Sequence, residues 1–131
     1  MKYIYPAIFT EDEDGILVDF PDLSNCYTDG ATIEEAFENA EDALALALWH
    51  LEVEHAAIPA PSVPASLIVP RDSTVALVRA DTLPVRQIND TRTVRKNVTL
   101  PGWMDTLARE HNINFSKLLQ NAICKECGVG V

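Results

Sequence analysis

The run from Val94 to Leu100, closed by Pro101, limits what this chain can fold into more than any other stretch. Its side chains alternate between the two faces of a pleated strand. A single strand leaves its backbone N–H and C=O groups unpaired, so this one needs a partner. The apolar face would carry Val94, Val98 and Leu100, and the polar face would carry Arg95, Asn97 and Thr99.

Two short amphipathic helices are predicted directly after the strand. Pro101 suits a first helical position, Asn112 suits a left-handed helix end, and Asn114 is a good N-cap. Strand and helices span roughly 32 residues, too few for a core of their own, so we expect two copies to pair through an antiparallel ribbon. The helical stripes would be Trp103, Met104, Leu107 and Ala108, then Leu118, Leu119, Ala122 and Ile123.

This segment resembles the ribbon-helix-helix family of DNA-binding domains, through its Arg-x-Asn-x-Thr-Leu-Pro run and the two helices. The resemblance implies that the ribbon enters the major groove of double-stranded DNA and that the second helix begins against a phosphate. Arg, Asn and Thr side chains can each recognise base edges or phosphates. The base-reading residues would be Arg95, Asn97 and Thr99, and the phosphate-binding amides would come from Asn114, Phe115 and Ser116.

The alternative for this stretch is an edge strand packed on an N-terminal sheet, with ordinary polar residues facing outward. Two compact helices directly after the strand argue against that alternative, because an edge strand would not need them. Lys96 departs from the ribbon pattern, which prefers an apolar inward residue there.

The formal net charge of −10 conceals two regions of opposite sign. Up to Pro70 the only basic side chain is Lys2, against fourteen Asp and Glu residues, while from Arg71 onward nine Lys and Arg stand against six acids. An acidic region repels DNA and attracts a basic partner. The asymmetry therefore predicts different partners for the two regions.

The first 80 residues are predicted to form strands and one long helix. Pro6 favours an edge position for the first strand, and Thr32 with Glu35 fits a capping box at the helix start. The expected strands are Lys2–Thr10, Ile16–Phe20, a short piece at Cys26–Thr28, and Thr74–Arg79.

The long helix carries two apolar stripes. The first would pack on the sheet, whereas the second would remain uncovered and serve a subunit or partner contact, or pack against the Pro-rich connector at residues 56–66. The first consists of Ile33, Ala36, Phe37, Ala40, Leu44, Ala47, Leu48 and Leu51, and the second of Leu46, Trp49 and Val53.

These features divide the chain into a domain at 1–80, a linker at 81–93 without periodicity, and a DNA-binding domain at 94–131. The sequence motifs that follow one another in the first domain are Lys2-Tyr3, Asp14-Gly15, Phe20-Pro21-Asp22-Leu23, Cys26, Asp29-Gly30, Thr32-x-x-Glu35-Ala36, Asn39-Ala40 and Ala43-Leu44. In this order they resemble the HicB antitoxin family. The resemblance covers nearly the whole chain.

That resemblance implies a partial ribonuclease-H-like β-β-β-α-β domain that binds a HicA toxin, a small basic mRNA-cleaving protein. It also implies a C-terminal DNA-binding domain of ribbon-helix-helix or helix-turn-helix type, and the residues favour the first, in an α+β chain overall. Charge complementarity would hold the toxin on an acidic rim. The residues expected to bind it are Glu11, Asp12, Asp14, Asp19, Asp22 and Trp49.

An enzyme is not expected. Nuclease chemistry needs carboxylates that converge on two metal ions, but Glu11 to Asp14 are neighbours on a hairpin turn and cannot all point inward. His50, Glu54 and His55 are too few for a metal site, and Cys124-x-x-Cys127 has no second pair, so neither a metal nor a cofactor is expected. The odd cysteine count and the lack of a signal peptide or apolar span predict a cytoplasmic chain without a membrane partner.

The sequence thus predicts an antitoxin that neutralises a HicA-type toxin and represses its own operon as a homo-oligomer, a dimer through the ribbon and a tetramer or larger assembly if both domains pair. The alternative is an orphan ribbon-helix-helix transcriptional regulator whose acidic domain senses a ligand or only dimerises. A third class, a metal-dependent nuclease, predicts magnesium-stimulated RNA cleavage.

Overall fold

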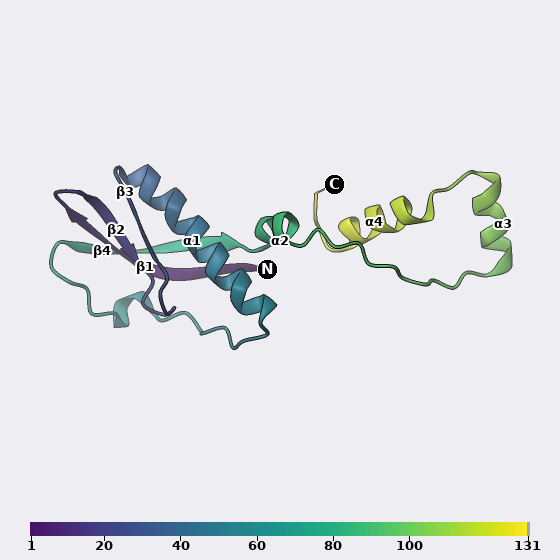
Figure 1. Ribbon diagram of the computed structural model, residues 1–131. Coiled ribbons are helices and arrows are strands. Elements are labelled where there is room, and N and C mark those ends of the chain that lie inside the picture. The colour runs from purple at the N-terminus through teal and green to yellow at the C-terminus, as the bar shows by residue number, and fades with distance from the viewer. Residues whose placement is uncertain (131) are drawn as a thin grey trace. The chain divides into compact units, whose positions relative to one another are not determined.

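The computed structural model describes residues 1–130, and the chain divides into two compact units, Met1–Arg92 and Thr93–Val131 (Figure 1). The first unit holds one sheet and its covering helix. The second holds two short helices and an extended segment before them.

The first unit has the predicted element order β-β-β-α-β. Its four strands form one antiparallel sheet in the order β3-β2-β1-β4, and α1 lies across one face of it (Figure 1). The elements are β1 (Lys2–Asp12), β2 (Gly15–Asp19), β3 (Tyr27–Gly30), α1 (Ile33–Val53), the short 3-10 helix η1 (Pro64–Ser66), β4 (Ser73–Asp81) and α2 (Leu83–Asn89).

The start of α1 is fixed by local chemistry. The Thr32 hydroxyl accepts the N–H of Glu35 at 3.2 Å, as the capping box predicts. Gly30 ends β3 directly before this cap, where a Cβ atom would lie 2.7 Å from the Cα of Ala36. Only glycine allows the strand and the first helical turn to approach this closely. The short extended piece expected at Cys26–Thr28 is the strand β3, which runs from Tyr27 to Gly30.

The core forms between the sheet and the first stripe of α1. Alternate residues of β1 point toward the helix, and the Phe9 ring stacks on Phe37 with centroids 4.6 Å apart. Ile33 was expected in this stripe but is half exposed, because it lines an open hollow beside Phe9 and Ile16 instead of being enclosed. The buried cluster is Tyr5, Ala7, Phe9, Val18, Phe20, Leu23, Cys26, Ala36, Ala40, Leu44, Ala45, Leu48, Val78 and Ala80.

The expectation that Pro6 marks an edge strand is wrong, because β1 lies between β2 and β4. Thr82 N–H donates to the Met1 carbonyl at 2.9 Å, in register with the β1–β4 ladder. Since antiparallel pairs alternate, Pro6 directs its nitrogen away from β4. Pairing with β2 begins only at Ile8, so Pro6 costs the sheet no hydrogen bond.

The expected linker at 81–93 is not a structureless connection. Seven of its residues form α2, which packs against α1. Its Thr82 is fully buried, and the Asp81 carboxylate accepts the N–H of Leu83 at 3.0 Å. The sequence did not reveal this helix, because its seven residues are too few to show a repeated apolar spacing.

The two helices of the second unit are α3 (Gly102–Glu110) and α4 (Phe115–Glu126). Asn114 caps α4 as predicted, because its side chain accepts the N–H of Lys117 at 3.1 Å. Asn112 adopts the expected left-handed conformation, with φ 52°. Pro101 lies one position earlier than expected, as the N-cap of α3 rather than its first residue.

The segment Val94–Leu100 forms no strand in the single chain. None of its backbone groups bonds to another backbone group among residues 1–130, and all its side chains are exposed. Of the described residues in this unit, only Ala108 is buried. The stripes predicted for α3 and α4 exist as faces of these helices, and apart from Ala108 their residues are exposed within the described chain.

Candidate functional site

The β1–β2 turn gathers the acidic residues singled out from the sequence. Open hollows of about 540 and 350 Å³ adjoin this turn, and both are lined in part by Asp12 and Asp14. Glu11 and Glu13 line the first hollow, and Asp29 with Glu35 lines the second. The turn is thus a concave acidic surface, to which we give the name acidic hairpin (Glu11, Asp12, Glu13, Asp14).

Asp19 and Asp22 lie apart from the acidic hairpin and differ from each other. Asp19 is exposed at the end of β2, near the buried thiol of Cys26. Burial first, and the Asp19 charge second, raise the pKa of Cys26 to about 11, so this thiol stays protonated. The Asp22 carboxylate already accepts two hydrogen bonds within the chain. One comes from the backbone N–H of Ser62, at 2.9 Å, and the other from the Ser62 hydroxyl. Asp22 fastens the Pro-rich connector to the β2–β3 loop.

Trp49 lines an open hollow of about 760 Å³ at the C-terminal end of α1. Its indole Nε1 is buried and has no hydrogen-bond acceptor among residues 1–130. Buried donors almost always have partners, so this unsatisfied N–H is an exception within the described chain. The rest of the lining mixes charge and apolar surface: Glu52, Val53, His55, Arg86, Asn89, Asp90, Thr91 and Arg92.

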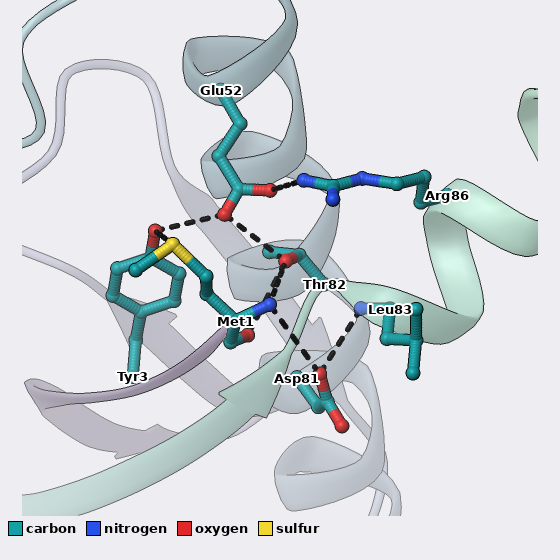
Figure 2. A network of polar contacts seen from close by, with 7 residues as sticks. All are labelled: Met1, Tyr3, Glu52, Asp81, Thr82, Leu83 and Arg86. Atoms are coloured by element: carbon teal, nitrogen blue, oxygen red, sulfur yellow. Dashed lines mark hydrogen bonds and ion pairs between the residues drawn. The ribbon is translucent and has the colours of Figure 1, made fainter. Parts of the chain in front are cut away.

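One wall of the Trp49 hollow is a polar network that the sequence did not reveal (Figure 2). Glu52 of α1 accepts hydrogen bonds from the Tyr3 hydroxyl at 2.8 Å, the Thr82 hydroxyl at 3.1 Å and the Arg86 guanidinium at 2.6 Å. The amino group of Met1 donates to the Thr82 hydroxyl at 2.9 Å. Side chains from β1 and from α2 with its N-cap therefore meet at one carboxylate of α1.

The network perturbs both of its acidic groups. Burial alone would raise the pKa of Glu52, but hydrogen bonds from Tyr3 and Thr82, with the nearby cations, hold that pKa below its usual value. Burial and the bond to Glu52 raise the pKa of Tyr3 to about 12. Glu52 is therefore a charged hub that fastens α2 to α1. No periodicity or motif could have revealed it, since Glu52 and Arg86 are 34 positions apart.

In the second unit, the predicted inward and outward faces of the extended segment differ in their surroundings. Val98 and Leu100 line an apolar hollow of about 310 Å³ with Phe115, Leu118 and Leu119 of α4. Lys96, the departure from the ribbon pattern, also lines it. Arg95, Asn97 and Thr99 do not line it and are exposed.

The start of α4 offers unpaired donors. Asn114 uses its side chain to cap Lys117, and the backbone N–H groups of Phe115 and Ser116 have no recorded partner in the described chain. Amides at a helix start, with the positive end of the helix dipole, can bind a phosphate group.

Two other possibilities find no geometric support between residues 1 and 130. No three His, Cys, Asp or Glu side chains there are grouped so that they could share a metal ion. Every helix there is too short or too polar for a bilayer crossing.

The chain resembles known proteins over most of its length. Residues 5–123 match the model of the HicB-like antitoxins of bacterial toxin–antitoxin systems. The chain is 36% identical over 106 residues to Antitoxin HicB 2 of Photorhabdus laumondii subsp. laumondii, covering 81% of this chain and 73% of that protein.

Two solved structures extend the likeness to the fold. A toxin–antitoxin complex from Streptococcus pneumoniae contains a chain with a TM-score of 0.62 and 26% identity, covering 96% of this chain and 99% of that one. A HicA3 and HicB3 toxin–antitoxin complex gives 0.51 and 27%, covering 60% and 99%.

Proposed function

Because the chain belongs to the HicB-like antitoxin family of bacterial toxin–antitoxin systems, we propose that it neutralises a HicA-type toxin and represses its own operon. The observation that carries the proposal is the division of charge between its two units. Met1–Arg92 contains five Lys and Arg against seventeen Asp and Glu, whereas the rest contains five against three. The first unit suits a basic protein, and the second suits DNA.

The toxin partner would be a small basic mRNA-cleaving protein held on the acidic hairpin. Glu11, Asp12 and Asp14 supply a concave acidic surface, and exposed Asp19 adds charge. Trp49 would supply a second contact through its half-buried ring, which lines an open hollow at the end of α1. Asp22 acts indirectly, by holding the connector in place through Ser62.

Charge reversal tests the toxin surface. Changing Glu11, Asp12 and Asp14 to Lys should slow association with the purified toxin and flatten its dependence on salt. The matched control reverses three exposed acids on α1, Glu38, Glu41 and Asp42, which changes the net charge equally. Equal slowing in both triple variants would mean that overall charge, rather than the acidic hairpin, attracts the toxin.

For DNA binding, we propose that two copies of Val94–Leu100 pair as an antiparallel ribbon. The pairing would satisfy the free backbone groups of this segment and cover the apolar hollow along α4. Arg95, Asn97 and Thr99 would then face the major groove, and the amides of Phe115 and Ser116 would bind a phosphate. A two-fold dimer of this kind predicts a palindromic operator.

Asn97→Ala tests base recognition. We expect a loss of about 1–3 kcal/mol for each contacted base, confined to the specific site. Binding to operator and to random DNA should be measured at one salt concentration, because phosphate contacts depend on salt. Lys125→Ala, a change of charge at the far end of α4, is the control. An unchanged ratio of operator to random affinity in Asn97→Ala would exclude base reading by this residue.

A tagged pull-down from the native host separates this function from the orphan-regulator alternative. A stoichiometric small basic protein, toxic when expressed alone, is the expected result. Recovery of DNA without such a protein would favour the orphan regulator.

A further inference from the structure

The face of the sheet opposite α1, which we call the open face, has an apolar centre. α1 packs on the other face, and residues directly opposite each other in an antiparallel ladder share a face (Figure 1). Where such a face meets water, its side chains are normally polar. Here Leu17 is 50% exposed and Tyr27 is 70% exposed. The apolar residues that the register places on the open face are Ile4, Pro6, Ile8, Leu17, Tyr27, Val75 and Leu77.

The register of β2 and β3 alternates apolar and acidic side chains on the open face. Leu17 lies opposite Asp29, and Asp19 lies opposite Tyr27. Each carboxylate therefore has one apolar neighbour across the strand pair and another two positions along its own strand. All four side chains are exposed, and neither carboxylate has a recorded ion pair within residues 1–130. A long basic side chain could lay its stem on this apolar surface and place its charge between the two acids.

The charge on the open face selects a basic partner. Lys2 and Asp81 lie opposite each other, so their charges offset. The other charged residues of this face are one base and three acids, namely Arg79, Asp12, Asp19 and Asp29. Asp12 also belongs to the acidic hairpin, so the acidic side of the open face is continuous with that surface. A second copy would bring the same excess of negative charge, whereas a basic protein with an apolar patch complements both properties.

We propose that the basic toxin docks on the open face, with apolar contacts at Leu17 and Tyr27 and a basic side chain between Asp19 and Asp29. The proposal rests on the antitoxin function and names the surface that holds the partner. The acidic hairpin and the open face then have different effects on binding. Exposed charges of the acidic hairpin speed the encounter, whereas the apolar contacts break only on dissociation and set the lifetime of the complex.

Leu17→Ser tests the apolar contact by its binding kinetics with the small basic protein recovered in the pull-down. Leu17 is half exposed, so the unit should keep its stability, which urea denaturation checks. Dissociation should accelerate about tenfold or more, with little change in the association rate. Ile68→Ser is the matched control, because it removes an isomeric apolar side chain from an exposed position in the connector that belongs to no strand. Its kinetics should equal those of the wild type.

Asp19→Asn combined with Asp29→Asn tests the basic contact. This double variant keeps the shape of both side chains and should lower toxin affinity by about tenfold or more. The control is Glu38→Gln combined with Glu41→Gln, which changes the net charge equally at exposed positions of α1. Equal losses of affinity in the two double variants would overturn the placement of a basic side chain between Asp19 and Asp29.

Acetylation of tyrosine by N-acetylimidazole gives a readout without any substitution. Of the three tyrosines, Tyr5 is buried and the Tyr3 hydroxyl is bonded to Glu52, so the reagent should reach Tyr27 first. Tyr27 should be acetylated in the chain alone and protected in the toxin complex. Protection in the chain alone would show that the open face is covered without the toxin, and it would overturn the proposal.

These outcomes separate failure of the docking surface from failure of the antitoxin function. If the wild type binds the basic protein and Leu17→Ser binds it with the same kinetics, the toxin docks elsewhere, so the surface is wrong and the function stands. If the wild type recruits no basic protein, both proposals are wrong. Faster dissociation of Leu17→Ser, together with protection of Tyr27 only in the complex, would support the open face as the docking surface.

Discussion

The two units of this chain differ in how much of their apolar surface a single copy buries. Met1–Arg92 buries fourteen residues in one cluster drawn from three strands, the β2–β3 loop and a helix, all within a single copy. The helices of the second unit are also amphipathic, but among its described residues only Ala108 is buried. The first unit has a core of its own, whereas the apolar faces of the helices in the second unit are exposed in the single chain. If the proposed ribbon forms, folding is unimolecular in the first unit and coupled to association in the second.

The strongest challenge to this contrast is Val98→Lys, measured by DNA binding. Val98 is 60% exposed in the single chain, so a lysine would not harm a unit that folded alone. In the ribbon dimer it would bury two charges, at about 3–5 kcal/mol for each unpaired charge, and operator affinity should fall by about 100-fold or more. Ile68→Lys, at an exposed position of the first unit, should leave affinity unchanged. Wild-type affinity in Val98→Lys would remove the need for a ribbon.

Leu44→Ala should affect the first unit alone. Leu44 is fully buried beneath the sheet, so truncation should cost about 2–5 kcal/mol in urea denaturation. Because the core belongs to one copy, the loss should be the same at every protein concentration. Leu46→Ala, at a 47% exposed position two residues away, should cost less than about 1 kcal/mol. Comparable losses in the two variants would contradict the assignment of the helix faces.

Glu52→Gln sharpens the comparison within the first unit, because it loosens α2 without opening the core. We expect a loss of about 1–2 kcal/mol at pH 7, since hydrogen bonds to a charged group are replaced by neutral ones. The folded pKa of Glu52 lies below its unfolded value, so its stabilisation is present above the unfolded pKa and disappears as pH falls through the folded pKa.

The pH series checks the sign of this effect. The difference in unfolding free energy between wild type and Glu52→Gln should be constant near neutral pH and shrink as the solution is acidified below about pH 4.5. Glu54→Gln, an exposed neighbour beyond the helix end, is the control and should show little difference at any pH. A difference that grew on acidification would contradict the role of Glu52 as a charged hub.

What the sequence predicted correctly rests on short-range chemistry. The caps at Thr32 and Asn114 and the left-handed Asn112 depend on residues within one turn, so the local sequence determines them. The element order of the first unit follows from periodicity in the same way.

What the sequence did not predict depends on partners far along the chain. The Glu52–Arg86 pair, the buried Thr82 and the helix α2 arise only when β4 returns beside β1. Pro6 was assigned to an edge because a proline cannot show which side of its strand lacks a neighbour. Among the candidate toxin residues, Asp22 looked like its acidic neighbours until the fold placed Ser62 against it.

The exposed segment between the units has a consequence for how long each activity would last in a cell. Residues 90–101 carry no regular secondary structure, and nearly all of them are exposed in the single chain. Proteases cut such segments first. A cut there would remove the unit proposed to bind DNA and leave the self-contained acidic unit intact. Pairing of the proposed ribbon would shield the site, so the turnover of the chain would depend on its own abundance. After a cut, the proposed DNA binding would be lost before the proposed toxin binding.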